Sequence, residues 1–219
     1  MSRGMTNSLE LELERHRVEQ LLQWERALWA QGLTYLAGVD EAGRGPLAGP
    51  VVAAAVIFPE DIFIARVNDS KKLMPVERET LYEIIMDKAL CVGIGQVSEE
   101  EIDRINILQA THQAMRLALG QLHIQPEHIL VDGYGLPGHS LPQTAIVGGD
   151  RKCFSIAAAS IIAKVTRDRM MIEYDKKYPQ YGFAQHKGYP TRAHIQAIQK
   201  YGLCPIHRRS YKIRKLIDE

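Results

Sequence analysis

Apolar residues recur at helical spacing near the start of the chain. Between residues 8 and 31, leucines and tryptophans repeat on one side, while charged residues such as Glu12, Glu19 and Arg26 occupy the other. The pattern predicts one amphipathic helix, which Gly32 ends. We expect this helix to form an N-terminal helical extension, residues 1–33, that packs on the protein's own core rather than on a partner.

The rest of the chain alternates between short apolar runs and segments of helical periodicity. Strands are predicted at residues 35–40, 51–58, 91–97, 129–132 and 144–147. Helices are predicted at residues 75–89, 98–122, 155–177 and 191–201, with Ser98 and Thr191 as N-caps and Ser70 capping the segment that follows it. Strands that cluster first and then alternate with helices predict an α/β domain over residues 34–219, with a mixed central sheet flanked by helices. A C-terminal helical region with a basic tail, at about residues 191–219, closes this domain.

Length and composition indicate an ordinary globular protein. The chain has 219 residues, of which 46% are hydrophobic and 24% charged, enough for one sizeable core with an appendage. No run approaches the roughly 18 apolar residues of a membrane span, and no secretory signal is visible. Three widely spaced cysteines (Cys91, Cys153 and Cys204) favour reduced thiols over disulfides or a zinc site. We therefore expect a cytoplasmic protein, and we expect a monomer.

The formal net charge is +1, so the chain as a whole is not a polycation. Nucleic acid would have to bind through a local basic patch. One such patch lies near the C-terminus and comprises Arg208, Arg209, Lys212, Arg214 and Lys215. A solvated helical tail explains this cluster equally well, and the residues alone leave both interpretations open.

Acidic residues follow three of the predicted strands. Asp40 with Glu41, Asp132, and Asp150 each stand at such an end, beside glycine-rich loops. Open α/β sheets place their ligand sites at these strand ends. Four carboxylates could not all stay charged there unless cations joined them, and two divalent ions about 3.5–4 Å apart would also support phosphoryl-transfer chemistry. Oxygen ligands favour Mg²⁺ or Mn²⁺ over zinc.

Asp40 and Glu41 pose a geometric difficulty because neighbours in a regular strand point to opposite faces of the sheet. Both side chains reach one site only if the strand ends or bulges there, which Gly43 would permit. The glycines of residues 38–50 also let backbone N–H groups come close to a phosphate or hydroxyl-bearing ligand.

Eight short motifs occur along the chain in one order. They are residues 38–50 (GVDEAGRGPLAGP), 69–73 (DSKKL), 106–111 (NILQAT), 131–133 (VDG), 149–150 (GD), 158–168 (AASIIAKVTRD), 186–191 (HKGYPT) and 207–210 (HRRS). Together they resemble the bacterial ribonuclease HII family over residues 35–211. The resemblance implies a ribonuclease H-like fold and an endoribonuclease that hydrolyses the RNA strand of RNA–DNA hybrids. It also implies cutting 5′ of single ribonucleotides in duplex DNA, with 5′-phosphate and 3′-hydroxyl ends, as in ribonucleotide removal from DNA.

The resemblance also implies roles for individual residues. Asp40, Glu41, Asp132 and Asp150 would be the catalytic acids that bind Mn²⁺ or Mg²⁺. Residues Gly43, Arg44 and Gly45 would read the ribose 2′-hydroxyl, and Tyr189 would stack near the sugar at an RNA–DNA junction. A hydroxyl that both donates and accepts suits a glycine-flanked backbone with exposed N–H and C=O groups.

Other polar residues are candidates for positioning a duplex without reading its sequence. The candidate phosphate contacts are Ser70, Lys71, Lys72, Arg44, Lys187, Arg208 and Arg209. Asp168 is a possible outer acid, although a helix-surface ion pair with Lys164 or Arg167 is the favoured interpretation. Metal-activated water needs no histidine base, so His186, His194 and His207 are interpreted as loop or phosphate-side residues.

Three alternatives compete with a metal-dependent ribonuclease. The first is a catalytically silent module that binds RNA–DNA hybrids, but four acids beside phosphates would weaken such binding. The second is ribonuclease HIII, whose N-terminal domain is larger than residues 1–33 could form. The third is a Mg²⁺ phosphotransferase, whose phosphate loop ends in Gly-Lys-Ser/Thr, an ending that residues 43–45 lack.

Overall fold

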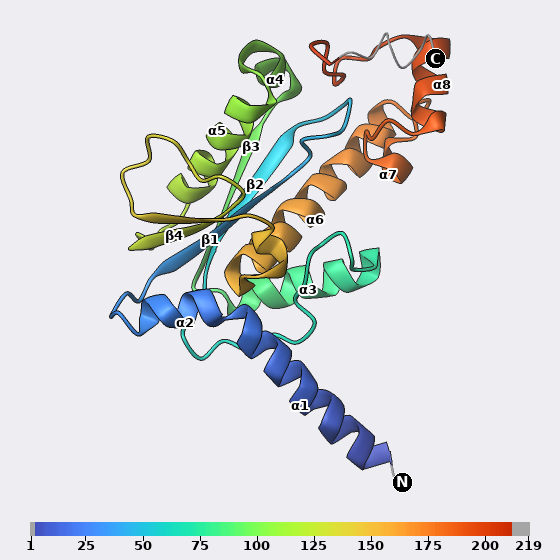
Figure 1. The fold of residues 1–219 in the computed structure, drawn as a ribbon. Helices are drawn as coiled ribbons and strands as arrows, with labels where there is room; N and C mark the ends of the chain where they lie inside the picture. Colours follow the sequence, from blue (N-terminus) through green and yellow to red (C-terminus); the bar gives the residue numbers. More distant parts are fainter. Residues whose placement is uncertain (1–2, 212–219) are drawn as a thin grey trace.

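A five-stranded mixed sheet forms the centre of the computed structural model, which describes residues 3–211 (Figure 1). The strands are β1 (Leu36–Ala42), β2 (Val51–Ile57), β3 (Cys91–Val97), β4 (His128–Asp132) and β5 (Gln143–Ile146), in the order β3-β2-β1-β4-β5. The first three strands pair antiparallel, whereas β1, β4 and β5 run parallel. The predicted mixed sheet is confirmed, and the carboxyl ends of β1 and β4 lie at the same edge of the sheet.

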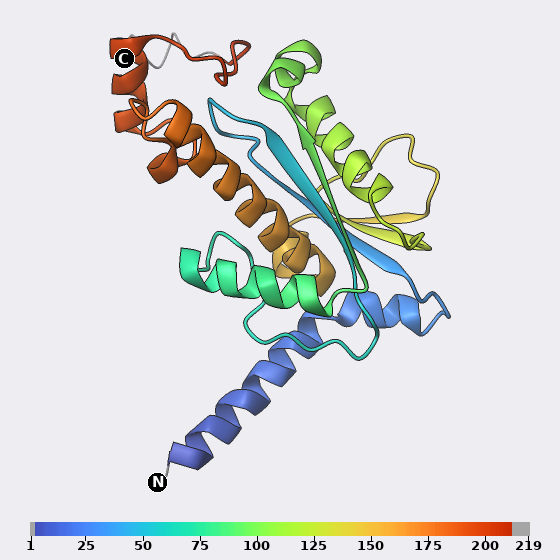
Figure 2. The same ribbon diagram turned by 180° about the vertical axis from the view of Figure 1, so that it is seen from behind.

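Helices cover both faces of the sheet, as Figures 1 and 2 show. On one face lie α6 (Phe154–Lys177) and α3 (Pro75–Lys88), and on the other α5 (Ile107–Gly120). The first half of α6 is small, apolar and buried all round. On the opposite face α5 packs directly on β3, where a Cβ added at Gly95 would lie 2.1 Å from a carbonyl oxygen of α5. Only glycine permits an approach this close.

The predicted N-terminal helix is two helices. They are α1 (Arg3–Leu21) and α2 (Gln23–Trp29), with a break at Leu22. The far end of α1 projects from the body of the molecule, while Val18, Leu21 and Leu22 belong to the main core (Figure 1). Packing on the protein's own core is therefore confirmed, and burial of the apolar residues around the break explains why α2 turns onto the domain.

The predicted helix over residues 98–122 is also two helices, α4 (Glu99–Ile105) and α5. Asn106 separates them with φ of +69°, and its side-chain oxygen accepts hydrogen bonds from the amides of Leu108 and Gln109. An asparagine tolerates this backbone conformation and caps a new helix. Ser98 caps α4 through the amide of Glu101, as predicted.

The prediction for Ser70 as a helix cap is wrong. Helix α3 starts after Met74, and the Ser70 hydroxyl is buried against that of Ser160, 2.9 Å away. Between the predicted helices 155–177 and 191–201, the structure adds the short helix α7 (Phe183–His186). Helix α8 (Arg192–Tyr201) is capped by Thr191, as predicted.

After α8 the chain returns to the loop between β1 and β2. His207 forms an isolated antiparallel bridge with Ala48 of that loop. Lys212, Arg214 and Lys215 of the predicted basic patch lie outside the described residues. Across residues 3–211, the helices are all too short or too polar to cross a membrane.

Candidate active site

The acidic residues of β1 and β4 converge at the carboxyl ends of these parallel strands. Asp40 and Glu41 belong to β1, and Asp132 is the last residue of β4. One carboxylate oxygen from each of the three lies within 4.8 Å of the other two. The prediction that strand topology would gather these side chains is confirmed for this trio.

The expectation that β1 ends or bulges at Asp40 and Glu41 is wrong. The strand continues through Ala42 in regular register, with Asp40 opposite Ala54 and Glu41 opposite Ala53. The register of β1 on β4 places Asp132 level with Asp40, so β4 ends before it would flank Glu41. We attribute the convergence to this early end, because it leaves room for the longer Glu41 side chain beside Asp132.

Asp150 does not end a strand. It lies in the short 3₁₀ helix Gly149–Arg151, where the amide of Gly149 donates a 2.6 Å hydrogen bond to Asp132 Oδ1. Its buried carboxylate pairs with Lys71 at 3.4 Å and Arg151 at 3.7 Å. The structure thus places Asp150 beside the trio of Asp40, Glu41 and Asp132. The link is the amide of the preceding residue, Gly149, which is hydrogen-bonded to Asp132.

The three converging acids carry an electrostatic cost. Burial raises the pKa of Asp40 well above its usual value, and the nearby charges of Glu41 and Asp132 raise it further. Burial also raises the pKa of Glu41, although Arg44 opposes this, and burial raises the pKa of Asp132. A divalent cation held by these oxygens would remove the repulsion. An all-oxygen donor set fits a hard ion such as Mg²⁺ or Mn²⁺.

The glycine loop after β1 lies beside Tyr189. A Cβ added at Gly45 would be 3.6 Å from the Tyr189 ring, which is 40% exposed. The amide of Leu47 donates to the carbonyl of Gly188 at 2.8 Å and joins the two loops. Arg44 is half-exposed and its guanidinium is 3.5 Å from the Glu41 carboxylate. The residues expected to contact the ribose therefore form one surface next to the acids.

The candidate phosphate contacts divide into exposed and buried residues. Lys71 and Lys72 are exposed, Lys71 beside Asp150, and Arg209 is exposed near the C-terminus. Lys187 is half-buried and its ammonium donates to the carbonyl of Ala184. Ser70 was expected to contact phosphates, but its hydroxyl points into the core and does not face solvent, so this prediction is wrong.

The prediction for Arg208 is wrong. Its side chain is 0% exposed, and its guanidinium is surrounded by backbone carbonyls of the glycine loop. Asp168 forms the expected ion pair with Lys164, at 2.5 Å, but the two side chains are only 14% and 19% exposed, so the pair is largely buried and does not lie on the helix surface; Arg78 is 3.9 Å from the same carboxylate. Arg167, the other suggested partner, is buried and bonds to carbonyls instead. In sequence, Arg167 follows the apolar stretch of this helix and stands among the charged residues Lys164, Asp168 and Arg169, so local pattern did not identify its role.

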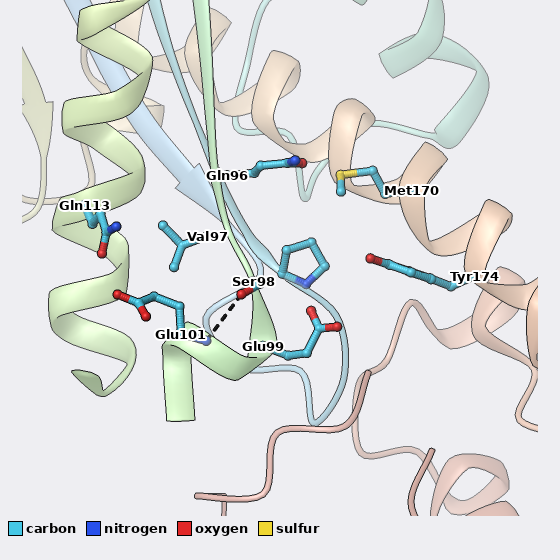
Figure 3. A pocket seen from close by; sticks show the side chains of 9 residues that line it. Gln96, Val97, Ser98, Glu99, Glu101, Gln113, Met170 and Tyr174 are labelled. Carbon is cyan, nitrogen blue, oxygen red and sulfur yellow. Dashed lines mark hydrogen bonds between the residues drawn. The ribbon is translucent and has the colours of Figure 1, made fainter. Parts of the chain in front are cut away.

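Two cavities flank this end of the sheet. One of about 340 Å³ lies between α3, α6 and the loop of Tyr189, and includes Arg78 and Lys164 in its lining. The other, of about 380 Å³, is lined by Gln96, Glu99, Glu101 and Tyr174, among others (Figure 3). The lining of this second cavity has carboxylates and no lysine or arginine, whereas the cavity near Tyr189 balances Glu79 and Asp168 with Arg78, Lys164 and Lys187, so the side near Tyr189 suits a phosphate backbone better.

A metal-dependent nuclease needs carboxylates that can share a divalent cation, and lysines nearby that can contact phosphates. This site has both. Residues 37–214 match the family model described as Ribonuclease HII. The chain therefore belongs to the ribonuclease HII family, whose members are metal-dependent nucleases of the ribonuclease H-like fold.

Individual relatives agree with this assignment. The chain is 57% identical to a ribonuclease HII of Acetivibrio thermocellus over 203 residues, covering 93% of this chain and 79% of that protein. It is 57% identical to a ribonuclease HII of Moorella thermoacetica over 199 residues, covering 91% and 97%. The crystal structure of the ribonuclease H2 from Pyrococcus horikoshii superposes with a TM-score of 0.69 at 32% identity, covering 84% and 97%. The predicted fold class and family are confirmed.

Proposed function

We propose that this protein is an endoribonuclease that hydrolyses the RNA strand of RNA–DNA hybrids. We further propose that it cuts 5′ of single ribonucleotides embedded in duplex DNA and leaves 5′-phosphate and 3′-hydroxyl ends. The observation that carries the proposal is the convergence of Asp40, Glu41 and Asp132 within 4.8 Å, with Asp150 alongside. Membership of the ribonuclease HII family supports the substrate class.

Asp40, Glu41, Asp132 and Asp150 would hold Mn²⁺ or Mg²⁺. When bound, two such ions activate water for attack on phosphorus and stabilise the departing 3′-oxygen. The protein's own part is to keep the carboxylates in place. The amide of Glu41 donates to Asp40 Oδ1 at 2.7 Å, and the amide of Gly149 fixes Asp132. These hydrogen bonds hold two ligands in position before any cation arrives.

Recognition of the ribonucleotide falls to the glycine loop and Tyr189. Within the described part of the chain, the amides of Arg44 and Gly45 make no hydrogen bond, so both remain available to a ligand. A ribose 2′-hydroxyl can accept from such an amide, whereas deoxyribose offers no partner. The Tyr189 ring lies 3.6 Å from where a Cβ of Gly45 would be, so it borders this loop and would provide a flat face for the sugar.

The domain organisation is also a proposal, with residues 1–33 as an extension and residues 34–219 as the catalytic domain. The family match beginning at residue 37 supports this division.

The test is cleavage of a labelled DNA duplex that contains one ribonucleotide, run with Mg²⁺, with Mn²⁺ and with a chelator. An all-DNA duplex and the Asp132→Asn protein serve as controls. We expect metal-dependent cutting 5′ of the ribonucleotide that disappears in the variant. A duplex that binds but stays intact with either metal would favour the catalytically silent binding module instead. Cutting of long hybrids alone would refute the roles given to Gly43, Arg44, Gly45 and Tyr189.

A further inference from the structure

Two arginines lie buried beneath the loop between β1 and β2. Arg167 of α6 is 1% exposed, and Arg208, in the segment after α8, is 0% exposed. Among the residues that the structure describes, neither forms an ion pair with a carboxylate within 4.0 Å. A buried, unpaired guanidinium is expensive to keep, so its donors need other acceptors.

Backbone carbonyls of the loop supply these acceptors. Arg208 Nε donates to Gly49 O at 2.9 Å, Nη1 to Arg44 O at 3.1 Å, and Nη2 to Gly43 O at 2.6 Å and Gly49 O at 2.7 Å. Arg208 Nη1 also donates to the Tyr211 hydroxyl at 2.9 Å, which in turn donates to Arg44 O at 2.6 Å. Both ends of the loop are thus tied to one side chain.

Arg167 ties the same loop to the segment that carries Tyr189. Its Nε donates to Pro50 O at 2.9 Å, Nη2 to Ala48 O at 3.0 Å and Nη1 to Lys187 O at 3.0 Å. The fit is tight, because a Cβ added at Gly43, whose φ is +97°, would lie 2.2 Å from Arg167 Nε. A lysine offers no planar fork and could not make this set of bonds.

The direction of these bonds affects the opposite side of the loop. Carbonyls that accept from Arg167 and Arg208 point into the protein, whereas the amides of Arg44 and Gly45 stay without partners in the described chain. A loop whose carbonyls are turned inward presents N–H groups outward. Two buried positive charges behind these groups also favour an electron-rich or anionic ligand in front of them.

We infer that Arg167 and Arg208 are positioning residues that set the ribonucleotide specificity of the enzyme. They hold the backbone of residues 43–50 so that its amides meet a ribose 2′-hydroxyl, and they leave the metal-binding acids unaffected. This inference rests on the proposed function, since it names the support for the loop that would read the ribose.

The test measures preference for ribose separately from folding and metal binding. The variants are Arg208→Lys and Arg167→Lys, which keep the charge and remove the fork, and Tyr211→Phe, which removes one hydroxyl at the half-exposed end of the network. Arg169→Lys is the matched control, because Arg169 lies on α6 but pairs with Glu79 and Glu83 on the surface. Each protein is assayed for thermal unfolding, for the Mn²⁺-induced thermal shift, and for affinity for a one-ribonucleotide duplex relative to the same all-DNA duplex. Steady-state cleavage of the one-ribonucleotide duplex and of a long hybrid gives KM and kcat.

We expect the two Arg→Lys variants to lose about tenfold in this preference, the equivalent of about 1.4 kcal/mol. KM for the ribonucleotide duplex should rise while the Mn²⁺-induced shift matches the parent. Tyr211→Phe should lose several-fold of the preference for the ribonucleotide duplex with an unchanged melting temperature. This variant tests the inference even if the arginine variants do not fold. Arg169→Lys should equal the parent.

Retention of the parent's preference by Tyr211→Phe and by every arginine variant that folds would overturn the inference. So would an equal loss in kcat on all substrates without a change in preference, because that result indicates a purely structural role. Failure of the proposed function looks different, since the unmutated protein itself would then neither cut nor prefer the ribonucleotide duplex.

Discussion

Glu25 offers a sharp test of how the N-terminal helices are joined to the catalytic domain. This residue of α2 is 2% exposed and its Oε1 accepts from Ser155 N at 2.7 Å, Ser155 Oγ at 2.8 Å and Cys153 Sγ at 3.1 Å. Ser155 lies in the first turn of α6, whose N-cap Cys153 makes no side-chain cap of its own. Glu25 therefore caps α6 from a distant part of the chain, at the helix end where negative charge is favoured.

The structure allows an estimate of what removal of this carboxylate would cost. Glu25→Ala deletes two hydrogen bonds from Ser155 to a charged acceptor, each worth about 1.5–3 kcal/mol, and leaves a buried N–H unpaired. Burial raises the pKa of Glu25, and its Oε2 has no hydrogen-bond partner in the described chain. Removal of this buried carboxylate therefore also removes a desolvation cost, which offsets part of the stability lost with the hydrogen bonds. We expect Glu25→Ala to lower the free energy of unfolding by about 3 kcal/mol. Glu25→Gln keeps an acceptor oxygen, so it should lower the free energy of unfolding by less than about 1.5 kcal/mol.

The pH dependence adds an independent check. A carboxyl whose folded pKa is raised stabilises the protein fully below its unfolded pKa, and this contribution is lost as pH rises through the folded pKa. The advantage of the parent over Glu25→Gln should therefore be larger at pH 5 than at pH 8.

The assay is equilibrium urea unfolding, followed by circular dichroism and by the fluorescence of Trp24 and Trp29 on α2. Glu19→Gln is the control, because Glu19 pairs with Arg26 on the exposed side and should change little. A loss below about 1 kcal/mol in Glu25→Ala, or equal losses in the alanine and glutamine variants, would refute the capping argument.

Three further outcomes are expected. Mn²⁺ should raise the melting temperature of the parent by several degrees and that of Asp40→Asn by less, because Asp40 supplies a buried carboxylate of the acidic cluster. Equal shifts of the two proteins in a fluorimetric thermal scan would contradict this prediction. Burial lowers the pKa of His194 and of His207 to about 4, so these groups should destabilise the fold as pH falls from about 6.5 toward 4, and His194→Gln should flatten that slope in thermal scans. Gly95→Ala should lower the free energy of unfolding in urea by about 1–3 kcal/mol, because the added Cβ meets the backbone of α5. Gly120→Ala, whose added Cβ would have no atom within 4 Å, should not lower it, and similar values for both variants would refute the close packing.

Short-range sequence patterns predicted much of the secondary structure. Serine and threonine caps located the starts of α4 and α8. Helix breaks were harder to predict, because periodicity continues across Leu22 and Asn106 even though the backbone does not. At Asn106, capping by one side chain outweighs the continuity of the apolar pattern.

The acids themselves were identifiable from sequence because charged residues at the end of an apolar run need a reason to be buried. Their convergence follows from strand topology, so Asp40 and Asp132 could be placed at one sheet end. How Glu41 joins them depends on where β4 ends relative to β1, which no local pattern encodes.

By itself, the sequence determined the mixed α/β class, the ribonuclease HII family and the acidic centre, because each depends on local patterns or on motifs in order. Only the tertiary structure decided the roles of Glu25, Arg167 and Arg208. In sequence they are ordinary surface-type charges, and Arg208 even belongs to a basic cluster that resembles a phosphate patch. Most of their hydrogen-bond partners lie more than 100 residues away along the chain, and only folding brings them together.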